Sequence, residues 1–249
     1  MIPKIIHYCW FGRNPLPNLA LRCIESWKIH LPDYEIIEWN EDNFDVKMIP
    51  YTAEAYKAKK YAFVSDYARF WILYKYGGLY FDTDVEVIRP MDDILSRGPF
   101  MGFENNGATT SGVAPGLGLG VNPGLGLYKE ILDYYAGEHF LKSDGTQNLK
   151  TVVIRVTEIL NKHGLKDNNV YQAVAGVNIY PFDYFCPIRI TDGKLCLTEN
   201  TVSIHHYAAS WTTPTHRFLR KVVLSVGGAT LKTRLVTTMN FIKSHLGGG

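Results

Sequence analysis

Short apolar runs alternate with helical patterns at the start of the chain. The runs KIIHYCWF at residues 4–11 and YEIIEWN at residues 34–40 are short and rich in β-branched and aromatic residues, which predicts two strands. Between them, apolar residues recur at nearly helical spacing over residues 18–30, directly after a proline, which predicts a helix. This order of strand, helix and strand is typical of an α/β fold with a nucleotide-binding sheet.

A strongly apolar helix is predicted over residues 61–76, YAFVSDYARFWILYKY, because large aromatic residues recur in it at helical spacing. Gly77 follows as a residue suited to ending the helix. Asp66 and Arg69 are three positions apart and therefore share one helix face. The simplest interpretation is a modest surface ion pair. In so apolar a helix, however, charged groups usually pair or face a cleft, which makes both residues candidates for a site.

The next segment, LYFDTDVEVI at residues 79–88, has the alternation of a strand. This alternation predicts that Tyr80, Asp82, Asp84 and Glu86 share one face. Carboxylates placed so closely repel each other unless a cation lies beside them. Mg²⁺ or Mn²⁺ suits such oxygen ligands and can bridge them to substrate phosphates. An Asp-x-Asp pattern is common by chance, so the preceding helix and glycines are needed to support this interpretation.

No glycine-rich phosphate-binding fingerprint follows the first strand, so a nucleotide must be bound by other means. His7 and Trp10 lie at the end of that strand, where parallel sheets place ligands, and an indole stacks well on a base. The alternative is a core tryptophan and a hydrogen-bonded structural histidine.

Composition favours one large domain without disulfides. The chain has 249 residues, of which 46% are hydrophobic, and its four cysteines form no CxxC pair, which predicts reduced thiols and a cytoplasmic protein. The first residues lack the pattern of a secretory signal. The uncharged segment at residues 105–127 is rich in glycine, which excludes a membrane helix and predicts a mobile loop, either on the acceptor side of a cleft or without function.

The C-terminal segment is basic. After residue 200 there are six Lys and Arg residues and no acidic residue, so residues 1–200 hold the other 20 basic residues and all 24 acidic ones, a net charge of −4. Apolar residues lie among these cations roughly as in amphipathic helices. Residues 214–249 are therefore expected either to pack on the domain as a terminal helix pair or to dock peripherally on an anionic membrane. Nucleic acid is not expected, since no base-reading aromatic motif is present.

Three segments in order resemble glycosyltransferase family 32: IPKIIHYCWFG at residues 2–12, the helix and acidic strand at residues 61–87, and HHYAASW at residues 205–211. This family has a DXD-containing sugar-binding region and includes bacterial capsular-polysaccharide enzymes and yeast mannosyltransferases. The large clostridial glucosylating toxins are more distantly similar. The resemblance covers residues 1 to about 100 and the late segment. It implies a GT-A fold, with a Rossmann-like sheet in one domain over residues 1–213.

The resemblance also implies the activity. The chain would be a retaining hexosyltransferase that uses Mn²⁺, or Mg²⁺, and a nucleotide-sugar donor, with UDP-hexose favoured. The acceptor would be a saccharide or a lipid-linked oligosaccharide in bacterial surface polysaccharide synthesis, at the cytoplasmic face of the membrane. No second carboxylate is placed as a nucleophile, so a front-face reaction is expected rather than a double displacement.

Residue roles follow from motif position in the family. Asp66 and Arg69 would bind hydroxyls of the donor sugar, and Trp10 would stack on the nucleobase beside His7. The complete set implied to contact the substrate is His7, Trp10, Ser65, Asp66, Arg69, Tyr80, Asp82, Ser210 and Trp211.

The resemblance implies a metal site as well. Asp84 would ligate the metal directly, Asp82 would contact the metal through water or contact the sugar or ribose, and His206 would be the third ligand in preference to His205. The set implied to be catalytic is Asp66, Arg69, Asp82 and Asp84.

Two other classes of function remain open. A haloacid-dehalogenase-like phosphohydrolase also uses a DxDx[TV] motif, with the first Asp as nucleophile, although there the motif normally ends the first strand. A non-catalytic nucleotide-sugar-binding module is the other alternative, and it would not need both carboxylates and a late histidine.

Overall fold

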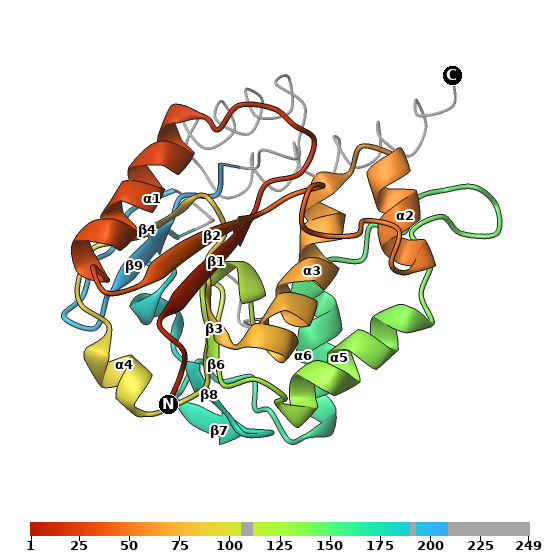
Figure 1. Cartoon of the computed structure of the whole chain (residues 1–249). Helices are drawn as coiled ribbons and strands as arrows, with labels where there is room; N and C mark the ends of the chain where they lie inside the picture. The colour runs from red at the N-terminus through yellow and green to blue at the C-terminus, as the bar shows by residue number, and fades with distance from the viewer. Residues whose placement is uncertain (106–111, 190–192, 209–249) are drawn as a thin grey trace.

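A seven-stranded mixed sheet forms the centre of the protein, and a separate pair of strands lies beside it (Figure 1). The computed structural model describes residues 1–105, 112–189 and 193–208. The strand order in the large sheet is β2-β1-β3-β6-β5-β8-β7, and β4 pairs with β9 in the small one. The strands are β1 Ile5–Cys9, β2 Glu35–Trp39, β3 Gly78–Tyr80, β4 Val85–Val87, β5 Phe100–Gly102, β6 Leu119–Val121, β7 Gln172–Val174, β8 Val177–Tyr180 and β9 Ser203–His205.

The strand directions place the ends of β1 and β3 at one edge of the sheet. Strand β1 runs parallel to β2 and to β3, with His7 opposite Tyr80. Strand β6 is antiparallel to β3 and to β5. Since ligands of open α/β sheets bind beyond the carboxyl ends of parallel strands, the residues after β1 and β3 lie where a nucleotide site is expected.

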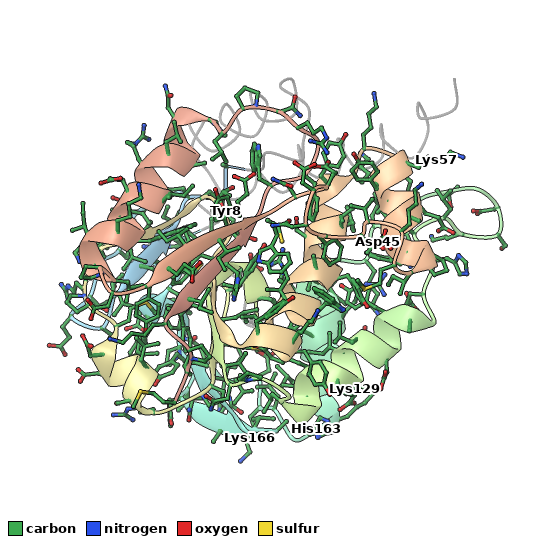
Figure 2. All side chains as sticks on the ribbon, viewed as in Figure 1. Tyr8, Asp45, Lys57, Lys129, His163 and Lys166 are labelled. Atoms are coloured by element: carbon green, nitrogen blue, oxygen red, sulfur yellow. The ribbon has the colours of Figure 1, made fainter. Side chains whose placement is uncertain are left out.

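Helices cover both faces of the sheet (Figure 1). One apolar core packs residues of α2, α3, α5 and α6 against the sheet, and a second core packs α1, α4 and β4 against the opposite face. Figure 2 shows side chains filling the space on both faces. The helices are α1 Asn18–His30, α2 Pro50–Lys57, α3 Tyr61–Tyr76, α4 Asp92–Ser96, α5 Gly126–Ala136 and α6 Val152–Lys162, with 3-10 turns η1 Pro115–Leu117 and η2 Phe182–Tyr184.

The predicted α/β fold class is confirmed, and so are the strand, helix, strand order at the start and the apolar helix at 61–76. The prediction of one continuous strand over residues 79–88 is wrong. A turn separates β3 from β4, and in it the Val85 amide donates to the Asp82 carbonyl at 3.0 Å. The aspartates therefore lie in a turn, where side chains do not follow strand alternation.

The glycine-rich segment contains a central strand rather than only a loop. Residues 119–121 form β6 between β3 and β5, in the middle of the sheet. Its Gly120 lies under the Phe100 ring, and a Cβ there would lie 2.2 Å from a ring carbon. Glycine is needed at this position because Phe100 occupies the space of a side chain.

All four cysteines are free, and three of them are buried, in agreement with the predicted absence of disulfides. No helix within residues 1–105, 112–189 and 193–208 has both the length and the apolarity to span a membrane. The basic segment 214–249 and the domain boundary expected at residue 213 lie outside the described residues.

Candidate active site

The site begins with a buried ion pair on α3. Arg69 Nη2 lies 3.0 Å from Asp66 Oδ1 and 3.3 Å from Asp82 Oδ1 in the turn after β3. The side chains of Arg69 and Asp66 are only 4% and 11% exposed, whereas that of Asp82 is 29% exposed. The interpretation of Asp66 and Arg69 as a surface ion pair is therefore wrong, because a buried guanidinium joins the helix to the acidic turn.

Electrostatics make this cluster unusual. Burial raises the pKa of Asp66 to about 7, although the positive charge of Arg69 opposes the shift. Burial alone would lower the pKa of Arg69, but Asp82, Tyr80 and Asp66 together outweigh it and raise that pKa, so the guanidinium stays charged. Two carboxylates thus share one arginine.

Arg69 keeps one donor available. Its Nε donates to the Ser65 carbonyl at 3.1 Å, and its carbon Cζ lies 4.9 Å from the centre of the Tyr80 ring. Nη1 is buried and has no hydrogen-bond partner among the described residues. Since buried donors are normally paired, Nη1 is suited to a hydroxyl or phosphate oxygen of a ligand.

Asp82 is held by contacts with Tyr80 and Gly116. The Tyr80 hydroxyl donates to Asp82 Oδ1 at 3.1 Å, and the Asp82 amide donates to the Gly116 carbonyl at 3.3 Å. A Cβ at Gly116 would lie 2.2 Å from Asp82 Oδ2. The glycine-rich segment therefore forms a wall of the site, and only a residue without a side chain fits there.

Asp84 contacts His205 and Ala208 of the late segment. Its Oδ1 lies 3.2 Å from His205 Nε2, and its Oδ2 accepts from the Ala208 amide at 2.8 Å. Burial alone would raise the pKa of Asp84, but the charge and hydrogen bond of His205 outweigh it and lower that pKa to about 2. Burial likewise opposes the charged form of His205, yet Asp84 raises its pKa.

A divalent cation fits this group. Among the described residues, Asp82, Asp84 and His205 each offer one ligand atom, and these atoms lie within 4.8 Å of one another. Two carboxylate oxygens suit Mg²⁺ or Mn²⁺, and an added imidazole favours Mn²⁺ over Mg²⁺. His205 Nδ1, which is buried, has no partner in the described part of the chain.

His205, and not the preferred third ligand His206, lies with the two aspartates in the structure. The Nε2 of His206 pairs with Glu86 Oε2 at 2.7 Å, so His206 points away from the group formed with His205. The physical reason is strand alternation, since neighbouring residues at the end of β9 project to opposite faces. Glu86, which the alternation had placed with the aspartates, is the partner of His206.

His7 also differs from the expectation of a contact with the nucleobase. It is buried, its Nδ1 accepts from Trp39 Nε1 at 3.0 Å, and its Nε2 lies 3.1 Å from the Gly77 carbonyl. Burial lowers the pKa of His7 to about 4, so the ring is neutral. With both nitrogens engaged, His7 joins β1 and β2 to the end of α3 and has no donor or acceptor left for substrate.

The other residues predicted to contact the substrate differ in their burial and in their hydrogen-bond partners. Trp10 is partly exposed after β1, where its Nε1 donates to the Asn14 carbonyl at 2.6 Å, and its ring remains a candidate for base stacking. Ser65 is partly buried and bonds within α3. Tyr80 is buried and bonds to Asp82. Ser210 and Trp211 lie outside the described residues.

Gly116 is the site residue that the sequence did not single out. The sequence predicted for its segment only a glycine-rich loop, either on the acceptor side of a cleft or without function. The spacing of glycines within an otherwise apolar stretch was a signal of close backbone packing, but nothing in it identified Asp82 as the neighbour.

The chain matches the family described as "Glycosyltransferase sugar-binding region containing DXD motif" over residues 17–101. This range includes both the Asp66–Arg69 pair and the Asp82–Asp84 pair, while His205 lies outside it. Residues 17–101 are therefore similar to the DXD-containing sugar-binding region of glycosyltransferases, the type of region that the sequence predicted.

Two curated proteins with a similar segment are named as mannosyltransferases. Inositol phosphoceramide mannosyltransferase 1 of Schizosaccharomyces pombe is 31% identical over 111 residues, which cover 40% of this chain and 33% of that protein. Inositol phosphoceramide mannosyltransferase 3 of the same yeast is 36% identical over 98 residues, which cover 38% of this chain and 27% of that protein. The matched segment thus spans about a third or less of these curated relatives.

One solved structure matches nearly the whole chain. It is a glycosyltransferase involved in glycosylation of the major capsid of PBCV-1, with a TM-score of 0.51 and 12% identity, and the match covers 90% of this chain and 100% of that one. At this identity the similarity concerns the fold, and it agrees with the GT-A class.

Proposed function

We propose that the protein is a metal-dependent hexosyltransferase that uses a nucleotide-sugar donor. The observation that carries the proposal is that Arg69 Nη2 contacts Asp66 and Asp82 together, so the sugar-binding helix is joined to the acidic turn. The ligand group of Asp82, Asp84 and His205 lies in and beside this turn. Groups for a sugar and for a diphosphate are thus adjacent.

The acidic and basic residues of the site have different roles in this proposal. In ionised form, Asp66 accepts hydrogen bonds from sugar hydroxyls, and the free Nη1 of Arg69 donates to the sugar or the diphosphate. Asp82, Asp84 and His205 would hold Mn²⁺ or Mg²⁺. When bound, the metal supplies positive charge that neutralises the leaving diphosphate.

The reaction we propose retains configuration by a front-face route. The bond between the anomeric carbon and the diphosphate oxygen breaks, the acceptor oxygen bonds to the same face, and its proton passes to the leaving phosphate. The clustered carboxylates Asp66 and Asp82 are already engaged by Arg69. This argues against either as a free nucleophile of the double-displacement kind.

UDP-hexose is the donor we favour, and GDP-mannose is its competitor, because the yeast relatives are named as mannosyltransferases. Their names also support a lipid-linked acceptor. We propose a saccharide or lipid-linked oligosaccharide of bacterial surface polysaccharide synthesis, glycosylated at the cytoplasmic membrane face, with residues 214–249 making the peripheral contact. Deletion of 214–249 should then weaken liposome binding more than donor hydrolysis.

The test is turnover with a donor panel. The protein is incubated with Mn²⁺ and UDP-glucose, UDP-galactose or GDP-mannose, and release of nucleoside diphosphate is followed. Release that needs Mn²⁺ and is lost in Asp84→Asn supports the proposal; no metal-dependent turnover or binding of any donor contradicts it. Phosphate release from a simple phosphoester would instead favour the phosphohydrolase, although Asp82 follows β3 rather than the first strand.

A further inference from the structure

Tyr207 lies two residues after His205 and packs its ring against the imidazole. The two ring centres are 4.2 Å apart and the ring planes are 84° apart, which is an edge-to-face contact. Tyr207 is half-buried and also packs against the apolar core that joins α1, α4 and β4 to the sheet. Aromatic rings packed in this way restrict each other's rotation, so the contact limits the positions open to the imidazole.

The hydroxyl of Tyr207 is anchored at the end of the ring. It lies 2.8 Å from Cys186 Sγ, and the Asn105 amide donates to the same sulfur at 3.2 Å. Cys186 is fully buried, and burial raises the pKa of its thiol to about 11, so the sulfur is neutral near pH 7. Burial raises the pKa of the Tyr207 hydroxyl, and Cys186 and Glu104 raise it further by charge and hydrogen bonding. The ring is thus held at its hydroxyl and packs on His205 with its side.

The imidazole of His205 needs such a support. Its Nε2 lies 3.2 Å from Asp84 Oδ1, and its buried Nδ1 has no hydrogen-bond partner in the described part of the chain. A metal-binding imidazole usually donates from its second nitrogen to a carboxylate or a carbonyl, and this bond sets the orientation of the ring. Among residues 1–105, 112–189 and 193–208, the ring of Tyr207 is in position to fix the imidazole instead.

The backbone of Tyr207 supports the same site. Its φ of 50° lies in the left-handed region, which is unfavourable for a bulky residue. On either side of this turn, the His206 amide donates to the Asp84 carbonyl at 2.9 Å and the Ala208 amide donates to Asp84 Oδ2 at 2.8 Å. An unfavourable conformation persists only where the surrounding contacts hold it, and such residues cluster at functional sites. Here the turn wraps the late segment around a candidate metal ligand.

We propose that Tyr207 is a positioning residue of the metal site, whose ring, anchored at Cys186, fixes the imidazole of His205 beside Asp84. This inference rests on the proposed function, in which His205 is a metal ligand. Without the ring, the imidazole rotates about its side-chain bonds, and Nε2 leaves its position beside Asp84 for part of the time. Metal binding then weakens, because the ligand must be ordered again each time the metal binds.

The test measures Mn²⁺ affinity by calorimetry, without donor or acceptor. Tyr207→Leu removes the ring, and Tyr207→Phe keeps the ring and removes only the hydroxyl. Tyr207→Gly is a second variant without the ring, and glycine adopts a φ of 50° without strain. Tyr184→Leu is the matched control, because Tyr184 is also half-buried against the same core, and its ring contacts are with Tyr180 and Phe185.

We expect Tyr207→Leu and Tyr207→Gly to lose about 10- to 100-fold in Mn²⁺ affinity, the usual cost of removing a residue that orients a metal ligand. Tyr207→Phe should keep most of the affinity, and Tyr184→Leu should match wild type. When His205 is already replaced by alanine, Tyr207→Leu should cause no further loss, because the ring acts through that imidazole. If Tyr207→Leu does not fold, Tyr207→Gly takes its place in both comparisons.

Three results contradict the inference in distinguishable ways. If His205→Ala weakens Mn²⁺ binding but the variants without the Tyr207 ring bind as tightly as wild type, Tyr207 only stabilises the fold and the inference alone is wrong. The inference alone is also wrong if Tyr207→Leu causes the same loss with and without His205, since the ring then acts on another group. If the wild type binds no Mn²⁺, the proposed metal-dependent function fails and the inference fails with it.

Discussion

His205 Nε2 lies 3.2 Å from Asp84 Oδ1, and this contact joins the late histidine segment to the acidic turn. Pairing of β9 with β4 brings the two residues together. Without metal they form an ion pair. The ionised form of Asp84 stabilises the folded state at pH values above the unfolded pKa of this carboxyl, and this contribution is lost as the pH falls toward about 2. The protonated form of His205 stabilises the folded state below its unfolded pKa of 6.5, and this contribution is lost as the pH rises through its raised folded-state pKa.

Mutation of the two neighbouring histidines should have unequal effects on metal binding. His205→Ala removes a ligand and should weaken Mn²⁺ binding about 10- to 100-fold, a typical cost of disturbing a metal site. His206→Ala is the matched control, because its ring pairs with Glu86 outside the ligand group. Calorimetric titration with Mn²⁺ measures both. A larger loss in His206→Ala would restore the original sequence prediction.

Mn²⁺ binding should also tighten as the pH rises. Asp84 raises the pKa of His205, so below that pKa a proton must leave the imidazole before it can bind metal. With one proton released, affinity should increase by up to about tenfold per pH unit and level off above the pKa of His205. His205→Ala should flatten this dependence. An unchanged slope in that variant would mean that another group releases the proton.

Much of the fold was visible in the sequence because its signals are local. Strand β1, helix α1 and helix α3 each bury a regular apolar pattern, and the structure has them where the pattern predicted. The pairing of Asp66 with Arg69 follows from helical spacing, and the contact between the acidic segment and residues near 205 was expected from the family resemblance.

The features of the fold and of the site that could not be predicted from the sequence depend on contacts between distant segments. The turn at residues 83–84 interrupts a pattern that reads as one strand, and only pairing with β9 and β6 defines where each half ends. The choice of His205 over His206 depends on that register. Burial of His7 under Trp39 and Gly77 likewise follows from the order of strands, not from its place after an apolar run.

Gly116→Ala should damage the site without unfolding the protein. The new methyl group would lie 2.2 Å from Asp82 Oδ2, so Asp82 must move, and turnover should fall about 100-fold. Gly126→Ala is the control, since nothing lies within 4 Å of a Cβ there and Gly126 begins α5, where alanine is favourable. Donor turnover and thermal unfolding are measured for both. Normal turnover in Gly116→Ala would mean that Asp82 is not needed in its present position.

Mutation of His7 should lower the stability of the fold, whereas mutation of Trp10 should weaken nucleotide binding. His7→Ala leaves the Trp39 Nε1 donor unpaired and a gap beside it, which should cost about 3 kcal/mol in the free energy of unfolding. Nucleotide affinity of the folded variant should be unchanged. Trp10→Ala should weaken nucleotide binding and change the free energy of unfolding only a little. Urea unfolding and calorimetry distinguish the two, and weakened nucleotide binding by folded His7→Ala would support the original expectation of a base contact.

Donor-sugar binding should depend on the protonation of Asp66. Burial raises its pKa to about 7, and sugar hydroxyls need the ionised form as acceptor, so binding should strengthen from pH 6 to pH 8. The stability of the fold depends on the protonation of Asp66 in the opposite direction. Because the folded-state pKa lies above the unfolded value, the fold favours the neutral acid, and the stability contributed by Asp66 is lost as the pH rises from about 4 to about 7.

The pKa of His205 is also raised, by the charge of Asp84, so the experiment must separate the two groups. At saturating Mn²⁺, the affinity for the sugar nucleotide is divided by that for the free nucleoside diphosphate at each pH, which removes the metal's contribution. This ratio should rise by about tenfold between pH 6 and 8 in the wild type. In Asp66→Asn it should be low and independent of pH, since an amide of the same size cannot ionise. A wild-type ratio that does not change with pH would exclude Asp66 as the titrating contact to the sugar.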